Sequence, residues 1–398
     1  MKATSRTIYH VLIGASSLVA VACGSKDAGP GPTVAPVVTC DNDPNRPTAI
    51  FDAVKALKKE ADGKKDNSTI NVTVIPNHWS PFWMTPSIGL AVAKREIGCQ
   101  ADMTAAALKG DPNAVQLQVD KINALVAAKS SGFGVSCKSG TAAAPAIANA
   151  VAAGIPVITF DSDAAKGDGA TVPFYGGRSM YFGSLNKPAS VQGAKPMVDA
   201  MSGSGKVLVV SSTATELNAQ LRVDGFIEGL AGTQMETVTY MLGDEYGKFV
   251  AAEADPMHPS KDINGFFSAY LKDLLASDPP GGIFVTQGTY GPVAADAVLA
   301  ANLAGKVHII AFDLASDTQR HLRNHVIDAT IVQKSYFFGY LGTYILWAMA
   351  VNGTDSVLQT LQPWMMGDQL DTGVDIVTPD SLDGYTNYQI QCLGLPNL

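Results

Sequence analysis

Short apolar runs alternate with longer amphipathic segments through most of the chain. The runs lack polar alternation, which is typical of strands buried on both faces of a parallel sheet, and the segments between them have helical periodicity. An α/β fold of doubly wound parallel sheets with right-handed crossovers follows from strands that alternate with helices in this way. We expect strands at 70–75, 101–108, 133–136, 155–161, 206–210, 236–242, 282–286, 307–312, 327–332 and 376–377.

This alternation is interrupted at 164–183, which is rich in Gly, Pro and aromatic residues, and again in a loop-rich segment at 244–261. Because a second series of strands and helices follows the first interruption, we expect two similar lobes. An amphipathic helix at 50–61 precedes the first strand and is expected to pack on the outside. The charge-free segment 336–351 contains two glycines and is shorter than a membrane span, so it predicts a buried helix.

The N-terminus has the features of an export signal. Lys2 and Arg6 precede an apolar stretch at 11–22, which ends in Ala-Val-Ala-Cys at residues 20–23. This ending resembles the lipobox of bacterial lipoproteins and predicts lipidation of Cys23; a secreted protein without an anchor is the alternative. Residues 25–38, with Gly-Pro alternation, then predict a flexible tether.

Composition narrows the functional classes. The chain has 398 residues, 46% of them hydrophobic, and a net charge of −8, which argues against binding nucleic acid through a basic face. After removal of the signal, Cys40, Cys99, Cys137 and Cys392 remain in an oxidising compartment, and a pairing of Cys40 with Cys392 is one of several possibilities. The absence of a C-x-x-C motif and of the signature motifs of hydrolases and metalloproteases indicates no metal, cofactor or catalytic site.

Polar side chains follow several of the expected strands, where open α/β sheets hold ligands. A single Asp at such a position also caps helices, but recurrence at equivalent strand ends favours a binding site. Carboxylates, amides and a guanidinium suit the vicinal hydroxyls of a sugar, and aromatic rings suit its C–H face. The candidates are Phe82, Trp83, Asp161, Arg222, Gln287, Asp313 and Gln333.

The segment between about 69 and 377 resembles the type I periplasmic binding proteins, in the branch that binds ribose, galactose and xylose for ATP-binding-cassette (ABC) importers. The resemblance rests on Pro-Phe-Trp at 81–83, AAGIPVITFDSDA at 152–164, 222–226, 282–287, 311–313 and DATIVQ at 328–333. It implies that Phe82 and Trp83 stack on a sugar and that Asp161, Arg222, Asp313 and Gln333 bind its hydroxyls. Gln287 stands where many members have Asn.

The resemblance also implies a division of the chain. It assigns 1–22 to a signal peptide, 23–68 to anchor, tether and extension, 69–184 with 334–362 to an N-terminal lobe, and 185–333 with 363–398 to a C-terminal lobe. Hinge crossings are expected near 184–186, 333–335 and 362–370. Segments 40–68, 164–183 and 244–261 depart from the family pattern.

The implied function is that of a monomeric, membrane-anchored, extracytoplasmic protein. It would capture a monosaccharide by closure of the lobes and deliver it to a permease. Ser162 stands where ribose binders have Arg, which argues against ribose itself. A nucleoside or furanose-like signal as ligand, a sugar-sensing receptor without transport, and an enzyme remain alternatives.

Overall fold

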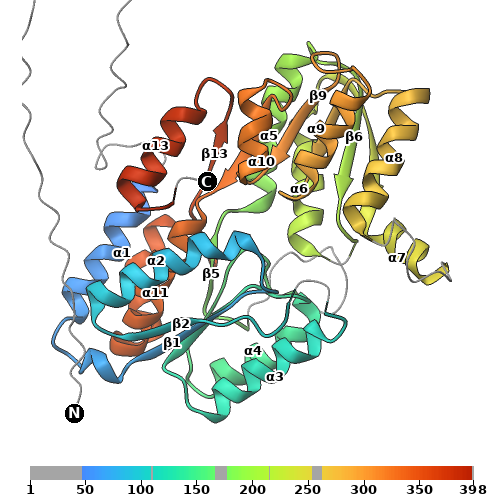
Figure 1. Ribbon diagram of the computed structural model, residues 1–398. Helices are drawn as coiled ribbons and strands as arrows, with labels where there is room; N and C mark the ends of the chain where they lie inside the picture. The colour runs from blue at the N-terminus through green and yellow to red at the C-terminus, as the bar shows by residue number, and fades with distance from the viewer. Residues whose placement is uncertain (1–46, 109–110, 166–176, 215, 253–261, 397–398) are drawn as a thin grey trace, which may run out of the picture. The chain divides into compact units, whose positions relative to one another are not determined.

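The computed structural model describes residues 47–396 except 109–110, 166–176, 215 and 253–261. Within these residues the chain forms two sheets with helices on both faces (Figure 1). Cys23 and Cys40 lie outside the described residues, as do the expected signal, lipobox and tether. None of the described helices combines the length and the apolar character that a membrane crossing requires.

The first lobe is built on a seven-stranded sheet. Its strands are parallel except for β11, which pairs antiparallel with β12. β1, β3 and β4 coincide with apolar runs of the sequence, and β3, β4 and β5 are buried throughout. In spatial order the strands are β11 (Met365–Met366), β12 (Gln369–Asp371), β5 (Met180–Gly183), β4 (Val157–Thr159), β3 (Gly132–Val135), β1 (Asn71–Ile75) and β2 (Gln100–Met103).

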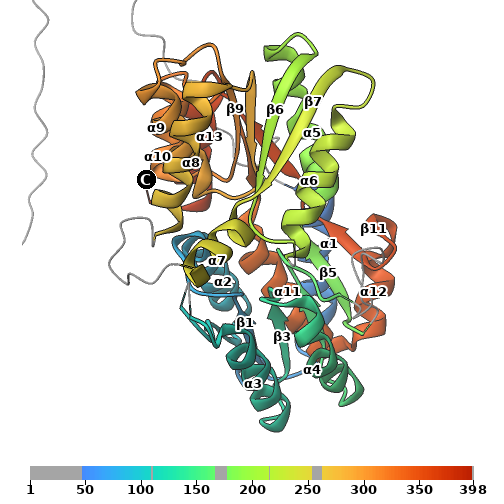
Figure 2. The same cartoon turned by 90° about the vertical axis from the view of Figure 1, so that its right-hand side faces the viewer.

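Helices cover both faces of this sheet. One face carries α3 (Ala114–Ala127) and α4 (Gly140–Ala152), whose apolar side chains pack with β3 and β4. The other carries α2 (Met84–Ile97) and α11 (Ser335–Asn352), which share a core with α1 (Thr48–Ala61) and α12 (Thr354–Leu361). The expected buried helix at 336–351 is therefore confirmed, and the 50–61 helix forms part of the lobe's core (Figure 2).

The second lobe is built on a six-stranded sheet, parallel except where β13 meets β10. One face packs on α5 (Asn186–Ala200) and α6 (Leu217–Gly229). The other packs on α8 (Ile263–Ser277), α9 (Tyr290–Ala300), α10 (Ser316–Arg323) and α13 (Leu382–Leu393). The strand order is β13 (Val374–Val377), β10 (Ala329–Gln333), β9 (His308–Phe312), β8 (Gly282–Val285), β6 (Ser204–Ser211) and β7 (Gln234–Met241).

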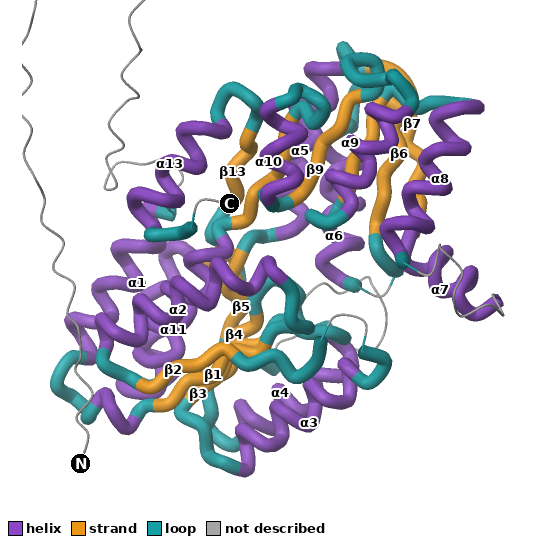
Figure 3. The backbone as a smooth tube through the Cα atoms, in the orientation of Figure 1, coloured by secondary structure: helices purple, strands orange, loops and turns teal. Residues whose placement is uncertain are grey.

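The two-lobed α/β prediction is thus confirmed, but three local expectations differ from the structure (Figure 3). The interruption at 164–183 contains β5, and the one at 244–261 overlaps α7 (Leu242–Ala252). The strand expected at 101–108 ends at Met103, beyond which Leu108 is exposed. These are short elements whose extent depends on tertiary packing, so local pattern does not reveal them.

The chain crosses between the sheets three times. β5 leads into α5 through Ser184 and Leu185, and β10 leads into α11 through Lys334. The third crossing lies at Thr372-Gly373 between β12 and β13, not at 362–370. Residues 365–371 therefore belong to the first sheet rather than the second lobe, because β12 pairs with β5.

The first and third crossings are bonded to each other. Ser184 Oγ donates to the Gly373 carbonyl at 2.9 Å, and the Leu185 N–H donates to Asp371 Oδ1 at 3.0 Å. α13 also links the two cores, because Leu382 packs in the second lobe whereas Leu395, just beyond the helix, packs in the first. Cys392 is disulfide-bonded, whereas Cys99 and Cys137 are free thiols.

Close contact between α2 and α11 gives a test of the first lobe's packing. A Cβ at Gly339 would lie 1.8 Å from the Pro86 carbonyl oxygen, whereas a Cβ at Gly384 in α13 would meet nothing within 4 Å. We expect Gly339→Ala to lower the free energy of unfolding by about 1–3 kcal/mol, as overpacking does. Gly384→Ala should be neutral or stabilising, because Ala favours helix over Gly.

Urea unfolding followed by circular dichroism measures both variants against the unaltered chain. Equal unfolding midpoints for Gly339→Ala and Gly384→Ala would contradict the close helix contact.

Candidate functional site

Two aspartates occupy corresponding positions in the two lobes. Asp161 lies just beyond β4 and Asp313 directly follows β9. Both have left-handed backbone conformations, with φ of 57° and 60°. Such conformations are uncommon outside glycine, although Asp tolerates them better than most residues, and they cluster at functional sites. The sharp turn at each strand end is therefore shared by both lobes.

The Asp161 side chain is buried, with 6% of its surface exposed. Ser136 Oγ, just after β3, donates to Asp161 Oδ2 at 2.8 Å, and an Arg222 terminal nitrogen lies 3.8 Å from Oδ1. Burial raises the pKa of the Asp161 carboxyl to about 6, and Asp313 and Glu216 add to this rise. Arg222 and the Ser136 hydrogen bond oppose it without cancelling it. The carboxylate is therefore only partly compensated.

Arg222 projects from α6 and has 3% of its surface exposed. Its Nε donates to Asn186 Oδ1 and its Nη1 to the Thr286 carbonyl, both at 2.8 Å. The guanidinium carbon lies 3.9 Å from the centre of the Phe312 ring, a cation–π arrangement. Nη2 has no hydrogen-bond partner among the described residues. A fixed, buried cation thus keeps one donor nitrogen available.

Asn186 connects this cation to the first lobe. It is the first residue of α5, immediately after the first crossing. Its Nδ2 donates to the Asp161 carbonyl at 3.2 Å while its Oδ1 accepts from Arg222. One side chain beside the first crossing therefore contacts both the guanidinium of Arg222 and the backbone of Asp161.

Asp313 and Gln333 form a second pair, in the second lobe. Gln333 Nε2 donates to Asp313 Oδ1 at 3.1 Å. Burial raises the pKa of Asp313, and Arg222 and the Gln333 hydrogen bond oppose the rise. Gln333 is 4% exposed, yet its Oε1 has no partner within the described chain. The Gln333 amide oxygen and the neighbouring Asp313 carboxylate are therefore two buried groups that can accept hydrogen bonds.

Gln287 follows Thr286 at the end of β8. Its Nε2 donates to Glu216 Oε2 at 3.0 Å. Glu216 is the N-cap residue of α6. It also accepts from Ser212 Oγ at 2.6 Å. Gln287 thus bonds a carboxylate that sequence reasoning missed, and this carboxylate adds to the rise in the pKa of Asp161.

The aromatic candidates lie in a short 3-10 helix, η2 (Pro81–Trp83), between β1 and α2. The Phe82 and Trp83 rings meet edge to face, with centroids 4.9 Å apart. Trp83 is 1% exposed and packs edge-on against Phe160 in the first lobe's core, whereas Phe82 is partly exposed. Of the two, Phe82 presents the free ring surface, and Trp83 holds it in place.

Because residue 162 is Ser rather than Arg, Arg222 supplies the one guanidinium of the group. A second buried arginine, Arg178, lies nearby in the sequence but donates from Nε and Nη2 to Asp163, both at 2.7 Å. Its Nη1 donates to Asp368 at 2.7 Å. Because these carboxylates occupy its guanidinium, Arg178 does not replace the donor that Ser162 lacks.

The predicted candidates therefore fall into three sets. Asp161 lies against Arg222, Gln333 bonds Asp313, and the charge of Arg222 acts on both carboxylates; Gln287 bonds Glu216; and Phe82 with Trp83 forms a separate pair on the first lobe. Sequence reasoning missed Ser136, Asn186 and Glu216. Ser136 and Asn186 each follow a strand closely, which was the available signal.

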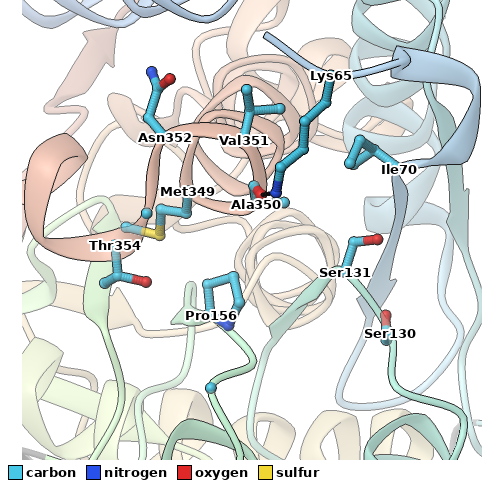
Figure 4. Close-up of a pocket in the computed structure, with 12 residues that line it drawn as sticks. Lys65, Ile70, Ser130, Ser131, Pro156, Met349, Ala350, Val351, Asn352 and Thr354 are labelled. Atoms are coloured by element: carbon cyan, nitrogen blue, oxygen red, sulfur yellow. Dashed lines mark hydrogen bonds between the residues drawn. The ribbon is translucent and has the colours of Figure 1, made fainter.

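A separate pocket of about 480 Å³ lies at the opposite, amino ends of the first lobe's strands (Figure 4). Lys65 lines it, but its Nζ donates to the Ala350 carbonyl at 2.6 Å. No other charged side chain lines it. Nowhere in the described ranges do three His, Cys, Asp or Glu side chains gather as a metal would require.

Comparisons with known proteins agree with this architecture. A solute-binding protein of an ABC transporter from Burkholderia graminis, solved with D-arabinose, is 25% identical and superposes with a TM-score of 0.62, covering 81% of this chain and 99% of its own. A solute-binding protein from Agrobacterium vitis, solved with alpha-D-tagatopyranose, is 21% identical, with a TM-score of 0.63 and coverages of 79% and 96%. One from Actinobacillus succinogenes, solved with D-allose, is 17% identical, with a TM-score of 0.61 and coverages of 80% and 100%.

A search of curated proteins found no match. The family model described as a periplasmic binding protein domain matches residues 72–354, which is most of the chain. The matched family and the solved relatives are binding proteins of transport systems rather than enzymes, in agreement with the expectation from the sequence. The chain therefore belongs to the periplasmic binding protein family and has its two-lobed type I fold.

Proposed function

We propose that this protein is an extracytoplasmic solute-binding protein that captures a monosaccharide between its two lobes for an ABC importer. The observation that carries the proposal is the set of unpaired buried atoms at the strand ends. Arg222 Nη2 and Gln333 Oε1 lack partners among the described residues, and both lie beside carboxylates with raised pKa. Buried polar groups are rarely left unpaired, so a polar ligand is the natural partner.

The chemistry of the group favours a ligand rich in hydroxyls. The carboxylates of Asp161 and Asp313 and the Gln333 amide oxygen accept hydrogen bonds, whereas Arg222 supplies the donor. Each sugar hydroxyl can donate to a carboxylate and accept from a guanidinium. Phe82 offers a ring face for the C–H side of the sugar. The sugars bound in the solved relatives support this class of ligand.

Ligand capture would close the lobes about the three crossings. Closure is favoured only by contacts that the ligand makes better in the closed state. Here those contacts would come from Asp161 on one lobe and from Arg222, Asp313 and Gln333 on the other. Export by the N-terminal signal, lipidation at Cys23 and delivery by a monomer to a membrane permease complete the proposal.

A thermal-shift screen tests the ligand class. The chain without residues 1–22 would be mixed with pentoses, hexoses, polyols and nucleosides. A ligand at a concentration one hundred times its Kd stabilises the folded state by about 2.7 kcal/mol and raises the melting temperature. A sugar hit supports the proposal; a nucleoside hit with no sugar hit would replace it; no hit at millimolar concentrations would overturn it.

The charged residues should dominate affinity for the ligand found. We expect Arg222→Ala and Asp313→Ala each to weaken binding by about 2–4 kcal/mol, because each change leaves buried partners unpaired. Titration calorimetry measures the loss. Arg320→Ala, which removes a half-exposed guanidinium from α10, is the control and should bind as the unaltered chain does. Unchanged affinity in both site variants would exclude this group as the binding site.

Affinity should also depend on pH in one direction. Asp161 has a pKa of about 6 without ligand, and hydroxyl donors stabilise its ionised form, so its pKa falls in the complex. Binding then releases a proton near and below pH 6, and affinity should rise as the pH rises through 6 and level off above. The change is at most about tenfold per pH unit for one proton. Calorimetric Kd values that are equal at pH 5 and pH 7.5 would contradict this role of Asp161.

A further inference from the structure

Lys138 and Glu216 form an ion pair that joins the two lobes beside the candidate site. Lys138 Nζ, on the first lobe, lies 3.4 Å from Glu216 Oε1, on the second. The side chains are 30% and 26% exposed, so the pair is sheltered from solvent on most of its surface. Such shelter reduces the screening that weakens fully exposed pairs.

The backbone of Lys138 is held in place by Gln118, a 1% exposed residue of α3. Gln118 Oε1 accepts from the Lys138 N–H at 2.8 Å. Its Nε2 donates to the carbonyls of Pro76 and Ser136, at 3.1 and 2.8 Å. Gln118 thereby ties Lys138 to the ends of β1 and β3, the same edge of the sheet that carries Ser136 and Asp161.

Glu216 is fixed just as firmly on the second lobe. Its Oε2 accepts from Ser212 Oγ and from Gln287 Nε2, which leaves Oε1 for Lys138. A carboxylate only accepts hydrogen bonds, so the Gln287 amide must present its nitrogen to Glu216. The Gln287 carbonyl oxygen is then the amide atom left to face a ligand. Glu216 thus sets the hydrogen-bonding character of a candidate ligand residue while it pairs across the lobes.

We propose that Lys138 and Glu216 are positioning residues that hold the lobes together when the protein is closed, so that their ion pair slows the release of ligand. The idea rests on the proposed function for its effect on ligand, but the pairing of the lobes does not need a ligand. An opening of the lobes separates Lys138 from Glu216, whereas all other partners of Glu216 move with it. The ion pair therefore stabilises the closed state and not the open one.

Ligand dissociation measured by stopped flow tests the proposal. We expect Lys138→Met to raise the dissociation rate constant about two- to fivefold. This change corresponds to the upper part of the range of about 0.2–1 kcal/mol that ion pairs near the surface contribute. Lys138→Glu should raise it further through repulsion, and Lys138→Arg should restore it. The association rate constant should change little. Lys272→Met, which removes an exposed lysine from α8, is the matched control.

A double-mutant cycle separates pairing from direct contact with ligand. If the residues act together, Lys138→Met should have no further effect once Glu216→Gln is present. Additive effects of the two changes would show that Lys138 acts on the ligand by itself and would overturn the proposal. High salt should reduce, without abolishing, the difference between Lys138→Met and the unaltered chain.

Small-angle scattering of the ligand-free protein gives a second, independent test. At low salt, Lys138→Glu should have a larger radius of gyration than the unaltered chain and Lys272→Met should not. If a sugar binds but none of these variants changes dissociation or dimensions, the ion-pair proposal fails and the proposed function stands. If no ligand is found, the proposed function fails while the scattering result still decides for or against the pairing.

Discussion

The organisation of this protein depends on one buried cation that interacts electrostatically with two buried carboxylates. Arg222 is held by Asn186 and by the Thr286 carbonyl and lies over the Phe312 ring, so its position is set before any ligand arrives. Asp161 and Asp313 nevertheless retain raised pKa values. The single guanidinium therefore compensates the two acids incompletely. A ligand whose hydroxyls donate hydrogen bonds to both carboxylates would offset the cost of burying them. The free energy lost by burying these charges would thus be regained on binding.

The same charges are connected to the crossings between the lobes. Asn186 begins α5 directly after the first crossing and bonds both Arg222 and the Asp161 carbonyl. The first crossing is in turn bonded to the third through Ser184 and Gly373. Gln333, which pairs with Asp313, ends β10 immediately before the second crossing at Lys334. Two contacts of the site, Asn186 with Arg222 and Gln333 with Asp313, thus each have one partner within a few residues of a segment where the backbone passes between sheets.

The regular part of this fold could be predicted because its information is local. Buried runs such as β6 and β9, and the long apolar helix α11, show a continuous apolar character that is visible in a short window. β5 and β12 could not be predicted in this way, since each is short and they pair with each other across a long stretch of chain, between β4 on one side and β11 on the other. The strand-end candidates were visible as residue types, but Asn186 and Glu216 act through partners that sequence spacing does not reveal.

Asp161 and Asp163 show most clearly what sequence alone leaves open. Both follow β4 in the segment Phe-Asp-Ser-Asp, and either fits the pattern of an acid at a strand end. Asp163 is fully engaged by Arg178, Thr159 and the Ala164 N–H, so its role is to fix the loop. Asp161 has one hydroxyl donor and a cation at 3.8 Å. Incomplete compensation, rather than acidity or position, therefore distinguishes Asp161 from Asp163, whose hydrogen bonds fix the turn.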